Sequence, residues 1–155
     1  MRKLSEVADA RALMAEGMNW SVVRWLKEKK RVRKTADLAN AALDRLDQEI
    51  KARWSDELKS AYGELGGNSS GAGQRQHKQT SQDVDPQVML LAKKLKESDD
   101  EAYRVRMDAE DTFDQAEKKL SSRLAREGCQ KAIDSWDLHE QAIRKSEAVI
   151  GATKA

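Results

Sequence analysis

Apolar side chains recur every three or four positions along two long stretches of this chain, one on either side of a glycine-rich segment. That spacing places them on one face of a helix, and it persists for more than five turns in each stretch. A stripe of this kind needs a partner helix to cover it, so the pattern predicts an all-α fold with coiled-coil-like packing. Lys29 interrupts the first stripe between Trp25 and Val32. The first stripe contains Val22, Trp25, Val32, Ala36, Ala39, Leu43, Leu46, Ile50, Trp54, Leu58, Ala61 and Leu65, and the second contains Val88, Leu91, Leu95, Ser98, Ala102, Val105, Ala109, Phe113, Ala116, Leu120 and Leu124.

The segment between the stripes divides the chain into two helical arms. Residues 66–85 contain four glycines and almost no apolar side chain, which is typical of a flexible linker. Asp85 followed by Pro86 indicates a helix start. The pair Gly66–Gly67 is expected to end the preceding helix, because glycine easily adopts the left-handed conformation of a C-terminal cap. We therefore expect an N-terminal arm over 1–65, a C-terminal arm over 86–150 and a short tail over 151–155.

The uninterrupted parts of the two arms, 18–65 and 86–127, have similar lengths, and this match predicts a long antiparallel helical hairpin. In the mirrored register, alanine-rich runs in the middle of each arm face one another and let the two backbones approach closely. An alternative is that alanine occurs at these positions only because it has a high helix propensity. The runs are Ala36, Ala39 and Ala42 in the first arm and Ala102, Ala109 and Ala116 in the second.

Two glycines mark possible breaks in the arms, but a single glycine inside a helix is tolerated, so the chain forms either two very long helices or four. Gly17 separates a short amphipathic piece from the first arm, and Asn19 could cap the helix that follows. Gly128 separates the second arm from its terminal stretch. The breaks near 17–19 and 128 predict that the end pieces fold back into a four-helix bundle, or that two hairpins dimerise to form one.

The charge of the chain is high in density but almost balanced. Its 155 residues include 29 basic and 27 acidic side chains, for a net charge of +2, so affinity for an anionic partner must come from a local patch. The longest apolar run, residues 88–92, is too short to span a membrane, and the N-terminus has no apolar block typical of a signal peptide. With a single cysteine, Cys129, no intramolecular disulfide can form. We expect a cytoplasmic protein without membrane insertion.

No pattern of catalytic or metal-binding residues emerges from the sequence. His139 lacks the Glu-x-x-His spacing of di-iron bundles, His77 lies in the linker, and no phosphate-binding loop or nucleophile elbow is present. The acidic residues between 97 and 117 spread around the helix, which favours a solvated face over a cation site. We expect no enzyme activity, no catalytic or metal residue and no cofactor.

The densest positive run, residues 24–34, has seven basic side chains against Glu28 alone. In the mirrored hairpin it faces residues 117–127, away from the acidic 97–117 stretch. Either that stretch of a second chain neutralises the run, or the run is free to bind phosphate or an acidic partner. The candidate contact residues are Arg24, Lys27, Lys29, Lys30, Arg31, Arg33 and Lys34, with Lys118, Lys119, Arg123 and Arg126 as additional candidates.

Three tryptophans, Trp20, Trp25 and Trp136, come together near one end of the mirrored hairpin. They fit either an aromatic plug that closes the bundle or a partner-docking patch, because tryptophan is enriched in binding hot spots.

Two functional hypotheses follow. The first is a non-enzymatic interaction or scaffold protein that binds a second copy of itself or another helical protein. The second is a nucleic-acid-binding protein that contacts phosphates through the basic run, with weak sequence specificity. A nuclear-import signal at residues 30–33 ranks third, because this segment lies inside an expected helix.

Overall fold

The computed structural model of the protein describes residues 5–66 and 84–154, and all regular secondary structure in these ranges is helical. The linker expected over 66–85 falls almost entirely outside the described residues. The described helices are α1 (Ser5–Gly17), α2 (Val22–Lys51), α3 (Asp56–Leu65), α5 (Pro86–Lys119) and α6 (Ser122–Lys154).

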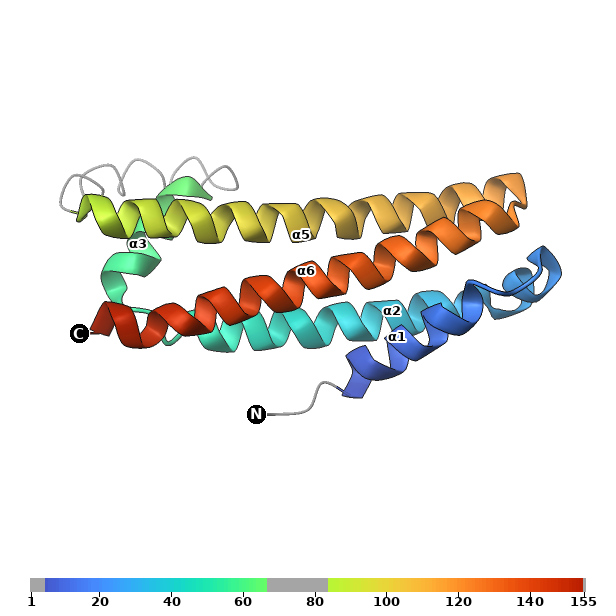
Figure 1. Ribbon diagram of the computed structural model, residues 1–155, viewed down its shortest axis with the longest axis horizontal. Coiled ribbons are helices and arrows are strands. Elements are labelled where there is room, and N and C mark those ends of the chain that lie inside the picture. Colours follow the sequence, from blue (N-terminus) through green and yellow to red (C-terminus); the bar gives the residue numbers. More distant parts are fainter. Residues whose placement is uncertain (1–4, 67–83, 155) are drawn as a thin grey trace.

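Three long helices, α2, α5 and α6, lie lengthwise beside one another, and α5 runs antiparallel to the other two (Figure 1). The two short helices cover different ends of this assembly. α1 folds back against α2 and α6, where Arg11 pairs with Asp137 and Glu140, and α3 packs against α5. The all-α helical bundle predicted from the apolar stripes is therefore confirmed.

Short-range capping signals set several helix starts. Asp85 accepts a hydrogen bond from the Gln87 amide at 2.8 Å and Pro86 occupies the first turn of α5, as the sequence predicts. The break near 17–19 is also confirmed, because α1 ends at Gly17. The cap of α2 is Ser21, whose hydroxyl accepts from the Arg24 amide at 3.2 Å, so the expected cap at Asn19 is wrong.

The chain does not break at Gly128, because this glycine lies inside α6, and α6 continues to Lys154 through the expected tail. The chain turns earlier, at Leu120, which has the left-handed φ of 51°. Ser121 then accepts a hydrogen bond from the Leu124 amide at 3.1 Å and caps the next helix. Gly128 serves close packing instead, since a Cβ built there would lie 2.5 Å from Phe113 Cδ1.

The first arm has a break that the sequence analysis did not anticipate. α2 ends at Lys51, and Ser55 caps α3 by accepting from the Leu58 amide at 3.2 Å. α3 ends at Leu65, just before the two glycines, as expected, but Gly66 has a φ of −94° and is not left-handed; Gly67 lies outside the described residues. This break turns α3 away from α2 and places it against α5.

The helices pair differently from the mirrored hairpin. α5 packs most extensively on α6, and α2 also packs on α6, whereas the backbones of α2 and α5 hardly approach each other. The expected close approach of the two alanine runs is therefore wrong, although all six alanines are buried. The reason is that α6 lies against both α2 and α5 and covers the buried faces of both helices.

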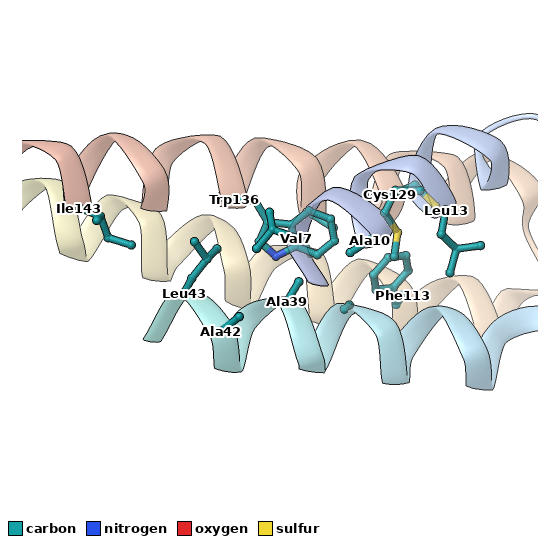
Figure 2. Close-up of a cluster of buried hydrophobic side chains, with 14 of the residues drawn as sticks. Val7, Ala10, Leu13, Ala39, Ala42, Leu43, Phe113, Cys129, Trp136 and Ile143 are labelled. Carbon is teal, nitrogen blue, oxygen red and sulfur yellow. The ribbon is translucent and has the colours of Figure 1, made fainter. Parts of the chain in front are cut away.

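The hydrophobic core extends along the length of α6, and its aromatic rings lie between smaller buried side chains (Figure 2). Trp25 and Trp136 are the largest side chains that are fully buried, together with Met14, Leu43 and Leu58. Burying one such side chain stabilises a fold by about 1.5–3 kcal/mol. Residues from α1, α2, α5 and α6 all reach this core, so the short helix α1 is a part of the bundle.

Candidate functional site

Three lysines of the basic run form an exposed face on α2. Lys27, Lys30 and Lys34 follow one another at helical spacing, and none of them has an ion pair within the described residues. The exposed apolar residues Val23 and Leu38, at 61% and 51% exposure, extend the same side of the helix at either end. We call these five residues the α2 lysine face.

The other basic residues of the run have partners within the chain. Arg33 pairs with Asp114 at 2.8 Å and Glu117 at 2.5 Å, and Lys29 lies 3.4 Å from Glu117. Desolvation opposes the charge of Arg33, but the hydrogen bonds to both carboxylates raise its pKa overall. The expectation that 24–34 and 97–117 do not meet within one chain is therefore wrong at the C-terminal end of the acidic stretch.

The remaining members of the basic run make local contacts. Arg31 pairs with Glu28 at 3.0 Å, while Arg24 lies 3.9 Å from Glu16 and 4.9 Å above the centre of the Trp20 ring. Both arginine side chains stay more than half exposed, and exposed pairs of this kind contribute little to stability. They border the α2 lysine face and leave its three lysines unneutralised.

The four basic residues around the α5–α6 turn differ in their surroundings. Arg123 pairs with Glu127 at 3.0 Å, and Arg126 donates to the Met18 carbonyl at 2.9 Å. Lys118 and Lys119 are exposed and have no ion pair in the described part of the chain. They follow Glu117, which pairs with Lys29, so they lie at the same end of the bundle as the α2 lysine face.

The three tryptophans considered for partner docking are all buried, with 7% exposure for Trp20, none for Trp25 and 1% for Trp136. The Trp25 ring stacks on Phe113 with centroids 5.4 Å apart, and the Trp136 indole donates to Asn40 Oδ1 at 2.9 Å. Their burial favours the interpretation as an aromatic plug over a surface patch.

A polar trough lies between α2 and α5, with α6 as its floor. Side chains cross it where the two backbones stand apart: Arg33 reaches Asp114 and Glu117, Arg106 reaches Asp44 at 3.1 Å, and Lys51 reaches Asp99 at 2.5 Å. Two cavities occupy the trough, and Arg106 lines both of them. We call the larger one, between the Arg106 and Lys51 links, the polar cavity.

Charges inside the polar cavity are strongly coupled. Lys51 binds Asp47 at 2.7 Å as well as Asp99, and these hydrogen bonds raise its pKa although desolvation opposes them. Tyr62 of α3 donates to Asp99, and burial followed by this contact raises the pKa of the phenol. Burial is also the main cause that raises the pKa of Asp47.

His139 lies on the floor of the polar cavity. It makes no hydrogen bond or ion pair to the residues that the structure describes. Desolvation lowers its pKa, although Asp47, Asp44 and Asp99 oppose this effect. The lowered pKa favours the neutral form of the imidazole.

The polar trough was not predicted from the sequence, where the acidic 97–117 stretch favoured a solvated face. The available signal was the spacing of Asp44, Asp47 and Lys51, which places three charges on one side of α2, next to its apolar stripe. Asp99 and Arg106 repeat that feature on α5. Which of these charges converge depends on how α2 and α5 pack on α6, and periodicity does not reveal this.

Other chemically active groups are few in the described ranges. Cys129 is buried, and desolvation raises the pKa of its thiol to about 12. Among residues 5–66 and 84–154, no three His, Cys, Asp or Glu side chains come together as a metal site. No helix in these ranges has the length and apolar character that a membrane crossing requires. His77 lies outside the described residues.

Comparison with protein-family models, curated proteins and solved structures finds no match to this chain.

Proposed function

We propose that this chain is a non-enzymatic helical interaction protein that binds an acidic surface through the α2 lysine face, and that a second copy of the chain supplies this surface. The observation that carries the proposal is that Lys27, Lys30 and Lys34 are exposed on one side of α2 without a carboxylate partner. Exposed Val23 and Leu38 add apolar area at the two ends of the face.

A second copy offers a matching surface on α5. Glu97, Glu101 and Asp111 are exposed, and none of them has an ion pair in the described part of the chain. Because the tryptophans and most of the apolar stripes are covered within one chain, association would be driven mainly by charge. Such binding should weaken as salt increases, because the Debye length falls from about 10 Å at 0.1 M to about 3 Å at 1 M.

Sedimentation velocity at about 0.05 M and about 0.5 M salt tests this proposal. We expect a dimer at low salt that dissociates at high salt. The combined substitution Lys27→Glu, Lys30→Glu and Lys34→Glu should abolish the dimer. A matched variant with the same charge change, Lys59→Glu, Lys93→Glu and Arg144→Glu, should keep it, because these exposed residues lie outside the face. A wild-type monomer at low salt would refute self-association.

Nucleic-acid binding is the second candidate, and the two exposed lysines beside the α5–α6 turn favour it. Lys118 and Lys119 extend the unpaired positive charge at the same end of the bundle. A gel shift with duplex DNA and with single-stranded RNA at low salt would separate the candidates. Binding that decreases steeply with salt and disappears in the Lys27, Lys30 and Lys34 variant would favour nucleic acid. No shift at low salt would exclude it.

A further inference from the structure

Two turns of the chain meet at one end of the bundle (Figure 1). One is the turn at Leu120 between α5 and α6, and the other joins α1 to α2 over residues 18–21. Arg126 links the two turns, because its guanidinium donates a hydrogen bond to the Met18 carbonyl at 2.9 Å. We call residues 118–126, together with residues 18–24, the basic tip of the bundle.

The basic tip carries positive charge that the chain neutralises only in part. Neither of its two segments contains an acidic residue, and its basic side chains are all exposed: Arg24, Lys118, Lys119, Arg123 and Arg126. Arg24 and Arg123 each pair with one glutamate, but their side chains remain 54% and 73% exposed. Lys118 and Lys119 have no ion pair within the described residues. Exposed positive charge gathered in this way attracts an anionic surface.

Leu120 places an apolar side chain in the middle of this charge. It is 59% exposed, and its left-handed φ of 51° strains a residue that has a Cβ. A glycine would adopt this conformation without strain, and little packing would be lost. Backbone strain that packing does not require indicates a functional role for the residue. A partner of the basic tip should therefore gain from contact with leucine as well as with positive charge.

An anionic lipid surface meets both requirements. Its headgroups carry negative charge that attracts lysine and arginine, and an apolar side chain that passes between them leaves water. The phosphate backbone of a nucleic acid supplies the charge alone, because it presents no apolar layer in which a leucine could be buried. The exposed Leu120 within the basic tip therefore favours lipid over nucleic acid at this end of the bundle.

We propose that the basic tip docks on an anionic phospholipid surface. Leu120 inserts between the headgroups, and Lys118 and Lys119 pair with lipid phosphates and carboxylates. The contact is peripheral, since only the turns at the end of the bundle reach the lipid. The basic tip contains none of the three lysines of the α2 lysine face, so this inference does not depend on the proposed self-association.

Flotation of the full chain with lipid vesicles at low salt tests the charge requirement. Vesicles of phosphatidylcholine alone are compared with vesicles in which phosphatidylserine replaces about a third of the lipid. We expect binding only to the vesicles that contain phosphatidylserine. Equal binding to both kinds of vesicle, or binding to neither, would overturn the proposal.

A double substitution and a matched control locate the charge. Each basic residue near an anionic surface strengthens binding by about fivefold, so Lys118→Gln with Lys119→Gln should weaken vesicle binding by about tenfold or more. Lys93→Gln with Lys94→Gln is the control, because these two neighbouring lysines are also exposed and lie toward the other end of α5. The control should bind as wild type does, and equal weakening by both double variants would contradict a contact at the basic tip.

The role of Leu120 separates a lipid contact from a general affinity for polyanions. Leu120→Ala keeps the strained backbone but shortens the apolar side chain, so vesicle binding should fall by about threefold or more. Leu90→Ala is the matched control, because Leu90 is 54% exposed near the other end of α5, and it should leave binding unchanged. Circular dichroism checks that both variants are folded. If folded Leu120→Ala binds the vesicles as wild type does, the basic tip recognises charge alone and the lipid assignment is wrong.

Discussion

The ring of Phe113 on α5 lies directly against the backbone of Gly128 on α6, where a Cβ would come within 2.5 Å of the ring. The Phe113 ring is held from its other side as well, because it stacks on the ring of Trp25 of α2. Three helices therefore meet at one small residue. Gly128 lets α5 and α6 approach closely and keeps the aromatic pair in place.

Gly128→Ala should consequently lower the free energy of unfolding by about 1–2 kcal/mol. Overpacking a fixed core costs about 1–3 kcal/mol, and the gain in helix propensity recovers at most about 1 kcal/mol. Urea unfolding followed by circular dichroism measures the difference. Gly63→Ala is the control, since a Cβ there meets nothing within 4 Å and should stabilise α3 slightly. A stabilised Gly128→Ala variant would contradict the close packing.

Leu120→Gly should stabilise the protein by up to about 1 kcal/mol. Leu120 has the left-handed φ of 51°, which costs a residue with a Cβ roughly 1–2 kcal/mol. Its side chain is 59% exposed, so removing it sacrifices little packing. The greater flexibility of glycine in the unfolded chain offsets part of the gain. Thermal unfolding checks the prediction, and Leu120→Ala should show no such gain because alanine keeps the strained Cβ.

The contrast between Asp85 and Gly128 shows how far the sequence could predict this fold. Asp85 and Pro86 start α5 through contacts within one turn, and this local signal predicts the helix start correctly. The role of Gly128 depends on Phe113, fifteen residues earlier in the chain, and Leu120 matches the apolar period although it ends α5. The charged links between α2 and α5 arise from the packing of both helices on α6. Periodicity predicts buried faces, but it does not determine which helices share them.

Stability should fall as the pH is lowered from about 7.5 to about 5, in part because of His139. Desolvation lowers its pKa in the folded chain below the ordinary value of about 6.5. Over this range the unfolded chain binds the proton more readily, so protonation favours unfolding. Asp44, Asp47 and Asp99 face the imidazole and limit the effect, whereas Arg106 adds to it. Urea unfolding at several pH values should show a shallower slope for His139→Gln than for wild type, and equal slopes would contradict the assignment.

Arg33 and Lys30 lie three residues apart in the basic run, but the loss of their charges should affect different properties of the protein: stability for Arg33 and self-association for Lys30. Arg33→Gln removes the link from α2 to Asp114 and Glu117, so it should lower stability by about 1 kcal/mol. Lys30→Gln removes an exposed charge without an ion pair within the described residues, so stability should stay within about 0.5 kcal/mol of wild type.

Measuring both variants by urea unfolding and by sedimentation at low salt separates structure from binding within one helix. Lys30→Gln should weaken self-association while the fold keeps its stability, because its charge is directed outward to a partner. Arg33→Gln should weaken the fold with a smaller effect on association. If Lys30→Gln destabilises the monomer as much as Arg33→Gln, Lys30 stabilises the fold as Arg33 does. That result would contradict the proposal that the α2 lysine face binds a partner.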